Sequence, residues 1–489
     1  MLNIKPKIWR QRLIAFVLLF GVTVSSFAIT PFVNSVPEFA LGAIVHFPRH
    51  SGQLDSVYQL YSQSGFNTFR DEFEWAWIER EKGRYHLDGQ DLSGPLEIFN
   101  SESAKIDSYP LFLLDYGNPL YWRTDTEDLS NPDVFARFTN GFIEYTRFMM
   151  KSMPNVRMFE VWNEWNINAH LCDSGCPKNI DDINQGSFYG QFLKKVSAFI
   201  KEERPEAVVL SQGLAYGKKS GGPDNRFLID SLNVGSVEYL DGVALHPYMF
   251  LDTGPERVYS YLVSTRRQLY KEVPDYKFRP LPFYITEMGW PTSQGTGYGH
   301  NITELQQSNL IERFSLLVKT LSYVKGLWLY DLVDDGLDET DNENNFGLVH
   351  ANLTTKPAFE MVSCLSAPII KGTEFQLLSG SFDPEIDPMK AYSWQPSVLN
   401  YGVSFFHHEE GLAETAYSAF WVADGTHKKI RISVDAASPV TISYSKGFCA
   451  SKLTAKLAVG GSVVLDVDDS PLYVSIPASQ GKLSFQFLN

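Results

Sequence analysis

The chain of 489 residues contains no cluster of basic residues in its body, and its formal net charge is −15. Nucleic-acid binding requires clustered Lys and Arg to neutralise phosphates, so we expect no nucleic-acid partner. The first strand-like run leads into GAIVHFPRHSG (42–52), which is not a Gly-rich phosphate loop, and this disfavours a doubly wound nucleotide-binding sheet. No segment beyond the N-terminal region is apolar for the roughly 20 residues that a membrane-spanning helix needs.

Cysteine is also scarce, with four residues that allow three disulfide pairings. We favour a small loop closed by Cys172–Cys176, which leaves Cys364 to pair with Cys449. A four-cysteine metal site is the alternative, but the second pair is too far apart in sequence for the usual ligand spacing. The sequence therefore predicts neither a metal centre nor a cofactor.

The N-terminus has the features of a secretory signal. Lys5, Lys7, Arg10 and Arg12 precede the apolar run 13–24, and small residues follow at 25–28. The apolar core is shorter than a membrane span, so we expect cleavage of residues 1–28 rather than a retained anchor. The mature protein is then secreted, extracellular or periplasmic, without a stable membrane span, in a compartment that permits disulfides.

Residues 41–362 alternate between short apolar runs and longer amphipathic ones. Helical patterns occupy 135–153, 189–203 and 304–324, among others. Repeated strand–helix units over this length predict an α/β protein with a parallel (β/α)8 TIM barrel. The eight strand-like runs are 41–47, 66–73, 109–117, 156–164, 207–213, 240–248, 281–290 and 326–335.

The pattern changes after Cys364. Runs at 428–436, 439–445, 462–476 and 482–489 alternate with Gly, Asp, Ser and Pro turns, which is typical of an all-β module. We expect a C-terminal β-sandwich over 363–489, with residues 29–40 as a linker or an additional sandwich strand.

Polar residues at the carboxyl ends of barrel strands face the active site of such a fold. Asn163 and Glu164 end the fourth strand-like run, and Glu287 lies near the end of the seventh. Two carboxylates facing each other across the barrel mouth are what glycosidic cleavage requires, since one donates a proton to the leaving oxygen and the other attacks C1 or activates water. Glu164 would have to hold a proton and Glu287 would have to be ionised.

Neighbouring strand ends supply supporting groups. Arg70 and Tyr248 are expected to contact Glu287 and keep it ionised. Asn163 is expected to bind a sugar 2-hydroxyl, and His246 is a further candidate. For an aromatic platform on which a sugar ring can stack we choose Trp328, extended by Trp75 and Trp77.

Four segments carry a family resemblance: VWNEWN (161–166), VALHPY (243–248), YITEMGWPT (284–292) and LYDLVDDG (329–336). They resemble clan A glycoside hydrolases, above all family 39 and neighbouring exopolysaccharide hydrolases, and then family 5. The resemblance implies a retaining mechanism with Glu164 as acid/base and Glu287 as nucleophile. One departure is Trp165, where many relatives have Pro.

The sequence thus predicts a secreted retaining glycoside hydrolase acting on a polysaccharide or oligosaccharide. Two alternatives stay open: a non-catalytic carbohydrate-binding or adhesion protein on the same scaffold, and a transglycosylase. The acidic run 331–345 is expected to be a solvated loop, with a calcium site as the alternative. Loop shapes, which sequence does not give, determine the polysaccharide, the linkage and endo or exo action.

Overall fold

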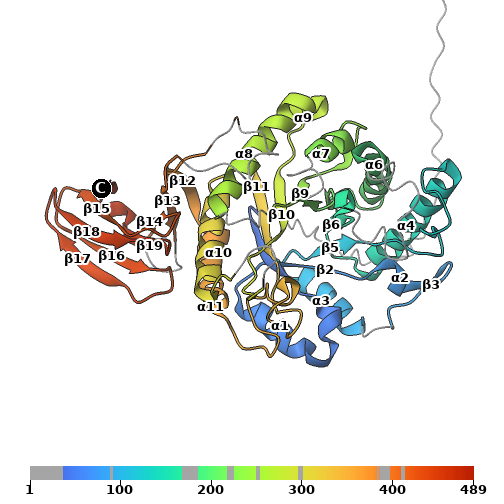
Figure 1. The fold of residues 1–489 in the computed structure, drawn as a ribbon, viewed down its shortest axis with the longest axis horizontal. Coiled ribbons are helices and arrows are strands. Elements are labelled where there is room, and N and C mark those ends of the chain that lie inside the picture. Colours follow the sequence, from blue (N-terminus) through green and yellow to red (C-terminus); the bar gives the residue numbers. More distant parts are fainter. Residues whose placement is uncertain are drawn as a thin grey trace, which may run out of the picture. The chain divides into compact units, whose positions relative to one another are not determined.

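The computed structural model describes residues 37–88, 92–167, 185–216, 225–248, 254–295, 301–382, 385, 397–408 and 413–488. The expected signal peptide and the pair Cys172–Cys176 lie outside these ranges. Within them the fold is a TIM barrel followed by antiparallel sheets (Figure 1).

The barrel is a single parallel sheet in which every predicted strand is present. Two short strands, β7 (Val208–Leu210) and β8 (Leu214–Ala215), share the fifth position, and a bridge from Leu210 to Gly242 closes the ring. The other strands are β1 (Ala40–Ile44), β2 (Thr68–Glu72), β5 (Leu111–Leu114), β6 (Met158–Val161), β9 (Val243–His246), β10 (Phe283–Met288) and β11 (Val324–Leu329).

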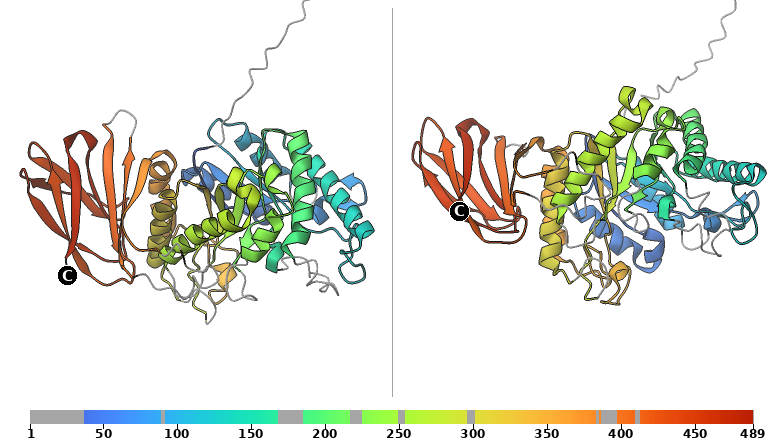
Figure 2. Two further views of the ribbon diagram at one scale, coloured as in Figure 1. Left: turned by 90° about the horizontal axis from the view of Figure 1, so that it is seen from above. Right: turned by 45° about the horizontal axis from the view of Figure 1, so that its top comes forward.

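A ring of helices covers the outside of the barrel (Figures 1 and 2). The Asn131 side chain caps α4 by accepting bonds from the backbone N–H groups of Asp133 and Val134, and Thr303 forms a capping box with Gln306 at α10. None of the described helices is long and apolar enough to cross a membrane. The longer helices of this ring are α1 (Leu54–Gln63), α3 (Ser93–Ser103), α4 (Pro132–Ser152), α6 (Gly186–Glu203), α7 (Asn225–Leu232), α8 (Pro255–Glu272), α10 (Glu304–Lys319) and α11 (Pro357–Lys371).

Small elements fill the loops between these strands and helices. A hairpin of β3 (Glu79–Glu81) and β4 (Arg84–Tyr85) follows the short helix α2 (Trp75–Ile78), and α9 (Pro274–Phe278) follows α8. The pattern expected to remain helical through 324 ends at Lys319, since Val324 already begins β11.

Strand alternation builds the barrel interior in layers. Side chains two residues apart point to the same side of a strand, so Met158 and Glu160 both face inward. The lower layer is apolar and includes Leu111, Met158 and Trp328. One step toward the carboxyl ends the buried residues become polar, with Arg70, Glu160, Thr286 and His246. This polar layer is the floor of the barrel mouth.

The C-terminal part is a β-sandwich, as expected. Valine, isoleucine and phenylalanine side chains, among them Phe420, Ile432 and Val474, form its core. One sheet has the order β12 (Thr373–Ser379), β13 (Asn400–His407), β14 (Thr415–Val422), β19 (Leu472–Pro477), β16 (Val440–Lys446) and β17 (Leu453–Leu457). The other has the order β18 (Ser462–Val467), β15 (Lys428–Asp435) and β20 (Lys482–Leu488).

The junction between the two parts differs from the expected boundary. Helix α11 continues to Lys371, so residue 362 lies inside it and the first sandwich strand begins at Thr373. The run 462–476, which appeared to be one strand, is divided between β18 and β19 in different sheets. Of the segment 29–40, Ala40 belongs to barrel strand β1.

A buried polar contact and a disulfide join the sandwich to the barrel. The Trp421 indole N–H donates to Glu256 Oε1 over 2.7 Å, and Glu256 is paired with Arg313. The backbone N–H of Phe448 donates to Glu312, where burial raises the pKa of the carboxyl to about 7. Cys364 on α11 is bonded to Cys449, which confirms this pairing.

We expect the Cys364→Ser/Cys449→Ser double variant to lose about 2–4 kcal/mol of unfolding free energy, because the cross-link closes a long loop of the unfolded chain. Urea unfolding followed by tryptophan fluorescence measures the loss. Reductant should abolish most of the difference in stability between the wild type and the double variant, because Cys172 and Cys176 are present in both proteins. Equal stability of the oxidised wild type and the variant would contradict the expectation.

Candidate active site

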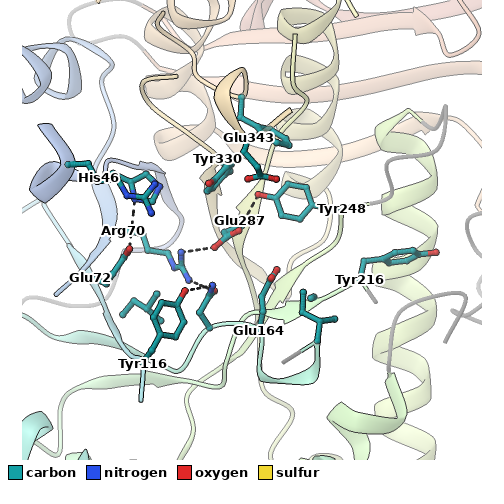
Figure 3. A pocket seen from close by; sticks show the side chains of 16 residues that line it. His46, Arg70, Glu72, Tyr116, Glu164, Tyr216, Tyr248, Glu287, Tyr330 and Glu343 are labelled. Atoms are coloured by element: carbon teal, nitrogen blue, oxygen red, sulfur yellow. Dashed lines mark hydrogen bonds and ion pairs between the residues drawn. The ribbon is translucent and has the colours of Figure 1, made fainter. Parts of the chain in front are cut away.

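A cavity of about 550 Å³ opens at the carboxyl ends of the barrel strands (Figure 3). Its charged lining consists of Arg49, Arg70, Glu72, Glu164, Glu287 and Glu343. Aromatic rings line other parts of the wall, namely Tyr116, Tyr216, Tyr248, Tyr330 and Phe346. The cavity therefore combines hydrogen-bonding groups with apolar faces, as a site for a polyhydroxylated ring requires.

Glu164 reaches the cavity through an unusual backbone conformation just after β6. Trp162 and Glu164 have φ angles of 76° and 48°, a region that few non-glycine residues adopt. The indole of Trp165 is fully buried, with its ring centroid 4.7 Å from that of Trp162, and its backbone N–H donates to Gln212. Trp165, where resembling families often have Pro, thus anchors the turn from behind.

Arg70 organises the site from below. Its Nε donates to Glu160 Oε2 over 2.6 Å, its Nη1 to Glu287 Oε1 over 2.8 Å, and its Nη2 to Asn163 Oδ1 over 3.0 Å. Only 2% of the residue is exposed. Arg70 holds these groups in fixed positions because a buried guanidinium retains its charge and needs all of these acceptors.

Glu287 has the two contacts that the sequence predicted. Besides Arg70, the Tyr248 hydroxyl donates to its Oε2 over 3.2 Å. Burial raises the pKa of Glu287 above its ordinary value, although His246 and Arg70 oppose the shift. Our expectation that Arg70 and Tyr248 keep Glu287 ionised did not include the cost of burying the carboxylate.

His246 lies between the two carboxylates. Its Nδ1 is 2.8 Å from Glu164 Oε1 and 3.4 Å from Glu287 Oε2, while its Nε2 is 3.0 Å from the Thr286 hydroxyl. The ring is completely buried, and burial lowers its pKa below the ordinary value. The imidazole is therefore neutral near neutral pH.

The distance between the carboxylates bears directly on the chemistry. One carboxylate oxygen of Glu164 and one of Glu287 lie within 4.8 Å of each other, and both lie within 4.8 Å of a His246 ring nitrogen. Retaining glycosidases have carboxyl groups about 5–5.5 Å apart, whereas inverting enzymes need about 6.5–9.5 Å for a water. The geometry fits the shorter separation.

The predicted tryptophan platform is not in the cavity. Trp328 is 0% exposed in the apolar barrel layer, where its indole N–H donates to Thr68 Oγ1. Tyr330, two residues later and also facing inward, lines the cavity instead. Our choice of Trp328 was wrong, because its ring lies in the inward-facing layer below the cavity. The sequence shows which residues of a strand face inward, but not how deep in the barrel each one lies.

The two other predicted tryptophans also lie outside the cavity lining. Trp75 is buried outside the barrel, where its indole N–H donates to Glu79. Trp77 is partly buried against the core. The buried Trp75 ring cannot stack on a sugar in this arrangement, and Trp77 is not part of the cavity lining, so aromatic content at a strand end was a poor guide to the platform.

The acidic run 331–345 is not simply solvated. Asp331 and Asp334 are buried, and the ammonium of Lys356 lies 2.8 Å from Asp334. Arg49 pairs with Asp335 over 2.9 Å. Protein cations thus already neutralise two carboxylates of this run, and Glu343 from the same run lines the cavity.

Sequence reasoning did not identify several residues of the site. Glu160 and Thr286 were not considered because each sits within an apolar run, four residues before Glu164 and one residue before Glu287. Their inward-facing parity with Met158 and Tyr284 was the available signal. Tyr116, at the end of the third strand-like run, also belongs to the site, and its hydroxyl accepts a bond from Asn163 Nδ2 over 2.9 Å.

No family model matches the sequence, and no curated protein matches it either. Among solved structures, a family 39 glycoside hydrolase from Bacteroides cellulosilyticus WH2 has a TM-score of 0.64 at 22% identity, covering 91% of this chain and 81% of that one.

An α-L-arabinofuranosidase from Thermotoga maritima has a TM-score of 0.51 at 12% identity, covering 90% of this chain and 97% of that one. A family 51 α-L-arabinofuranosidase from Bifidobacterium longum has a TM-score of 0.50 at 12% identity, with coverages of 90% and 96%. The matches extend over most of the chain, and they show that its fold is one that glycoside hydrolases have.

Replacing Arg70 tests its role as the organiser of the site. We expect Arg70→Gln to lower the unfolding free energy by about 3–5 kcal/mol, because the fully buried Glu160 loses its charged partner. Arg84→Gln is the control, since the exposed Arg84–Glu81 pair contributes at most about 1 kcal/mol. Urea unfolding measures both variants, and a loss no larger than that of the control would disprove the role.

Proposed function

We propose that this protein is a secreted retaining glycoside hydrolase that cleaves O-glycosidic bonds in a polysaccharide or oligosaccharide. The proposal rests above all on the oxygens of Glu164 and Glu287, which lie within 4.8 Å of each other in a cavity lined by hydroxyl, amide and aromatic groups. The likeness in fold to glycoside hydrolases of families 39 and 51 supports it, and the signal-like N-terminus supports export.

In the first step the Glu287 carboxylate attacks the anomeric carbon while the glycosidic C1–O bond breaks. Glu164 transfers its proton to the departing oxygen, so that the leaving sugar departs as an alcohol. The product is a glycosyl ester on Glu287 and a Glu164 carboxylate. Arg70 and Tyr248 hold the Glu287 oxygens in place during the attack.

In the second step Glu164 acts as a base. Its carboxylate removes a proton from water, the water oxygen bonds to C1, and the ester bond to Glu287 breaks. Two inversions at C1 restore the original configuration. A sugar hydroxyl in place of water would give transglycosylation by the same route. Asn163 at the cavity wall is suited to bind the 2-hydroxyl, and Tyr330 and Phe346 offer ring faces.

A panel of polysaccharides and aryl glycosides, with the anomeric configuration of the first product followed by proton NMR, tests the proposal. Release of sugar with retained configuration supports it. Inverted product would overturn the retaining mechanism, and binding without any release would instead favour a carbohydrate-binding protein.

The two acids should respond differently to substitution. We expect Glu287→Gln to lose at least 1,000-fold in kcat on every substrate, since the nucleophile is gone. Glu164→Ala should lose about 100- to 10,000-fold on substrates with poor leaving groups and far less in the first step on activated aryl glycosides. Glu312→Gln is a matched control, because this buried glutamate lies in α10 outside the cavity. Full activity of Glu287→Gln would disprove the assignment.

The acid limb of the pH profile should reflect the raised pKa of Glu287. The nucleophile must be ionised, so kcat/KM should fall on acidification at a higher pH than for an ordinary glutamate. Tyr248→Phe removes a hydrogen bond that stabilises the ionised carboxylate, so the pKa of Glu287 should rise. The midpoint of the acid limb should therefore move to higher pH by about one unit. The control Tyr276→Phe removes a hydroxyl that bonds Leu281 far from the cavity. An unshifted limb in Tyr248→Phe would contradict the expectation.

A further inference from the structure

A continuous chain of buried hydrogen bonds connects Arg70, which contacts the proposed nucleophile Glu287, to the proposed acid/base residue Glu164. It begins at Arg70, which holds Glu287, and passes to Glu160 over 2.6 Å. The Thr286 hydroxyl donates to the other Glu160 oxygen over 2.8 Å, and the same hydroxyl lies 3.0 Å from His246 Nε2. His246 Nδ1 then reaches Glu164 over 2.8 Å.

The direction of each bond in this chain follows from proton counting. Glu160 is buried against the Arg70 guanidinium, and its two oxygens accept from Arg70 Nε and from the Thr286 hydroxyl. The single hydroxyl hydrogen of Thr286 is therefore used toward Glu160, and its oxygen can only accept from His246. Nε2 of His246 must carry the hydrogen, and in the neutral ring Nδ1 is left with a lone pair directed at Glu164.

We infer that Thr286 is a positioning residue, which together with Glu160 fixes the tautomer of His246 so that Nδ1 accepts a hydrogen bond from the protonated carboxyl of Glu164. A carboxyl group that donates to this lone pair is held in its protonated form in the free enzyme. The inference rests on the proposed function, because it assigns the origin of the proton that Glu164 delivers to the leaving group.

Thr286 has a second consequence, which concerns the charge of the imidazole. Glu160 Oε1 lies 3.8 Å from His246 Nε2, and the threonine hydroxyl is bonded to both atoms. If Glu160 contacted Nε2 of His246 directly, its negative charge would favour the imidazolium form of the ring. The additional proton on Nδ1 would then come from Glu164. Among the described residues, the charged and titratable groups that face His246 or Glu164 include Arg70, Glu160, Tyr248, Glu287 and Glu343.

Thr286→Val removes the hydroxyl at nearly constant volume and tests the inference. We expect kcat/KM on glycosides with poor leaving groups to fall about 10- to 100-fold, with a loss below about threefold on activated aryl glycosides. The basic limb of the pH profile of kcat/KM should move to lower pH by about one unit, because Glu164 loses its proton more easily. Thr286→Ser, which keeps the hydroxyl, should restore the wild-type profile.

The control is Thr146→Val, which removes a buried hydroxyl that bonds the carbonyl of Phe142 within α4. A Thr286→Val variant with equal losses on both substrate classes and an unmoved basic limb would overturn the inference, since a displaced Glu287 would act in that way. A wild-type profile in this variant would overturn it as well.

Imidazole 15N chemical shifts give a readout that does not depend on activity. The His246 signals, assigned by their absence in His246→Gln, should show the Nε2–H tautomer in the wild type and a change in Thr286→Val but not in Thr146→Val. An Nδ1–H tautomer in the wild type would disprove the inference. If no glycoside is hydrolysed, the proposed function fails, while the tautomer is still measured.

Discussion

The buried guanidinium of Arg70 is the interaction on which the site depends. A buried charge is costly unless it is paired and hydrogen-bonded, and here Glu160, Glu287 and Asn163 each accept a hydrogen bond from the guanidinium. These three partners belong to the floor and wall of the cavity. The cost of burying the charge thus fixes the positions of the groups that would perform chemistry.

The barrel supplies this arrangement through its layers. An apolar layer closes the interior below, and the next inward-facing positions carry polar residues that have no access to bulk water. Charges in such a layer interact strongly because the surroundings screen them poorly. The raised pKa of Glu287 and the lowered pKa of His246 share this origin, since burial is the largest cause of both.

The residue pattern was enough to predict the barrel, the sandwich and the two acids, because strand alternation and strand–helix repeats are local features of the chain. The aromatic platform was predicted wrongly. Trp328 and Tyr330 have the same parity on one strand, and only the closed barrel shows that the tryptophan lies a layer below the cavity. For the same reason Glu160 and Thr286 escaped notice, since their partners are up to 126 residues away in sequence.

Sequence alone therefore determined which elements form and which carboxylates stand at the ends of strands. It also pointed to the disulfide between Cys364 and Cys449, which the structure contains. Only the tertiary structure decided the depth of each inward-facing side chain, the separation of Glu164 from Glu287 and the hydrogen-bond chain through His246. These properties depend on strands meeting around a closed ring, and burial in that ring shifts the pKa values of Glu287 and His246 away from those that residue type alone implies.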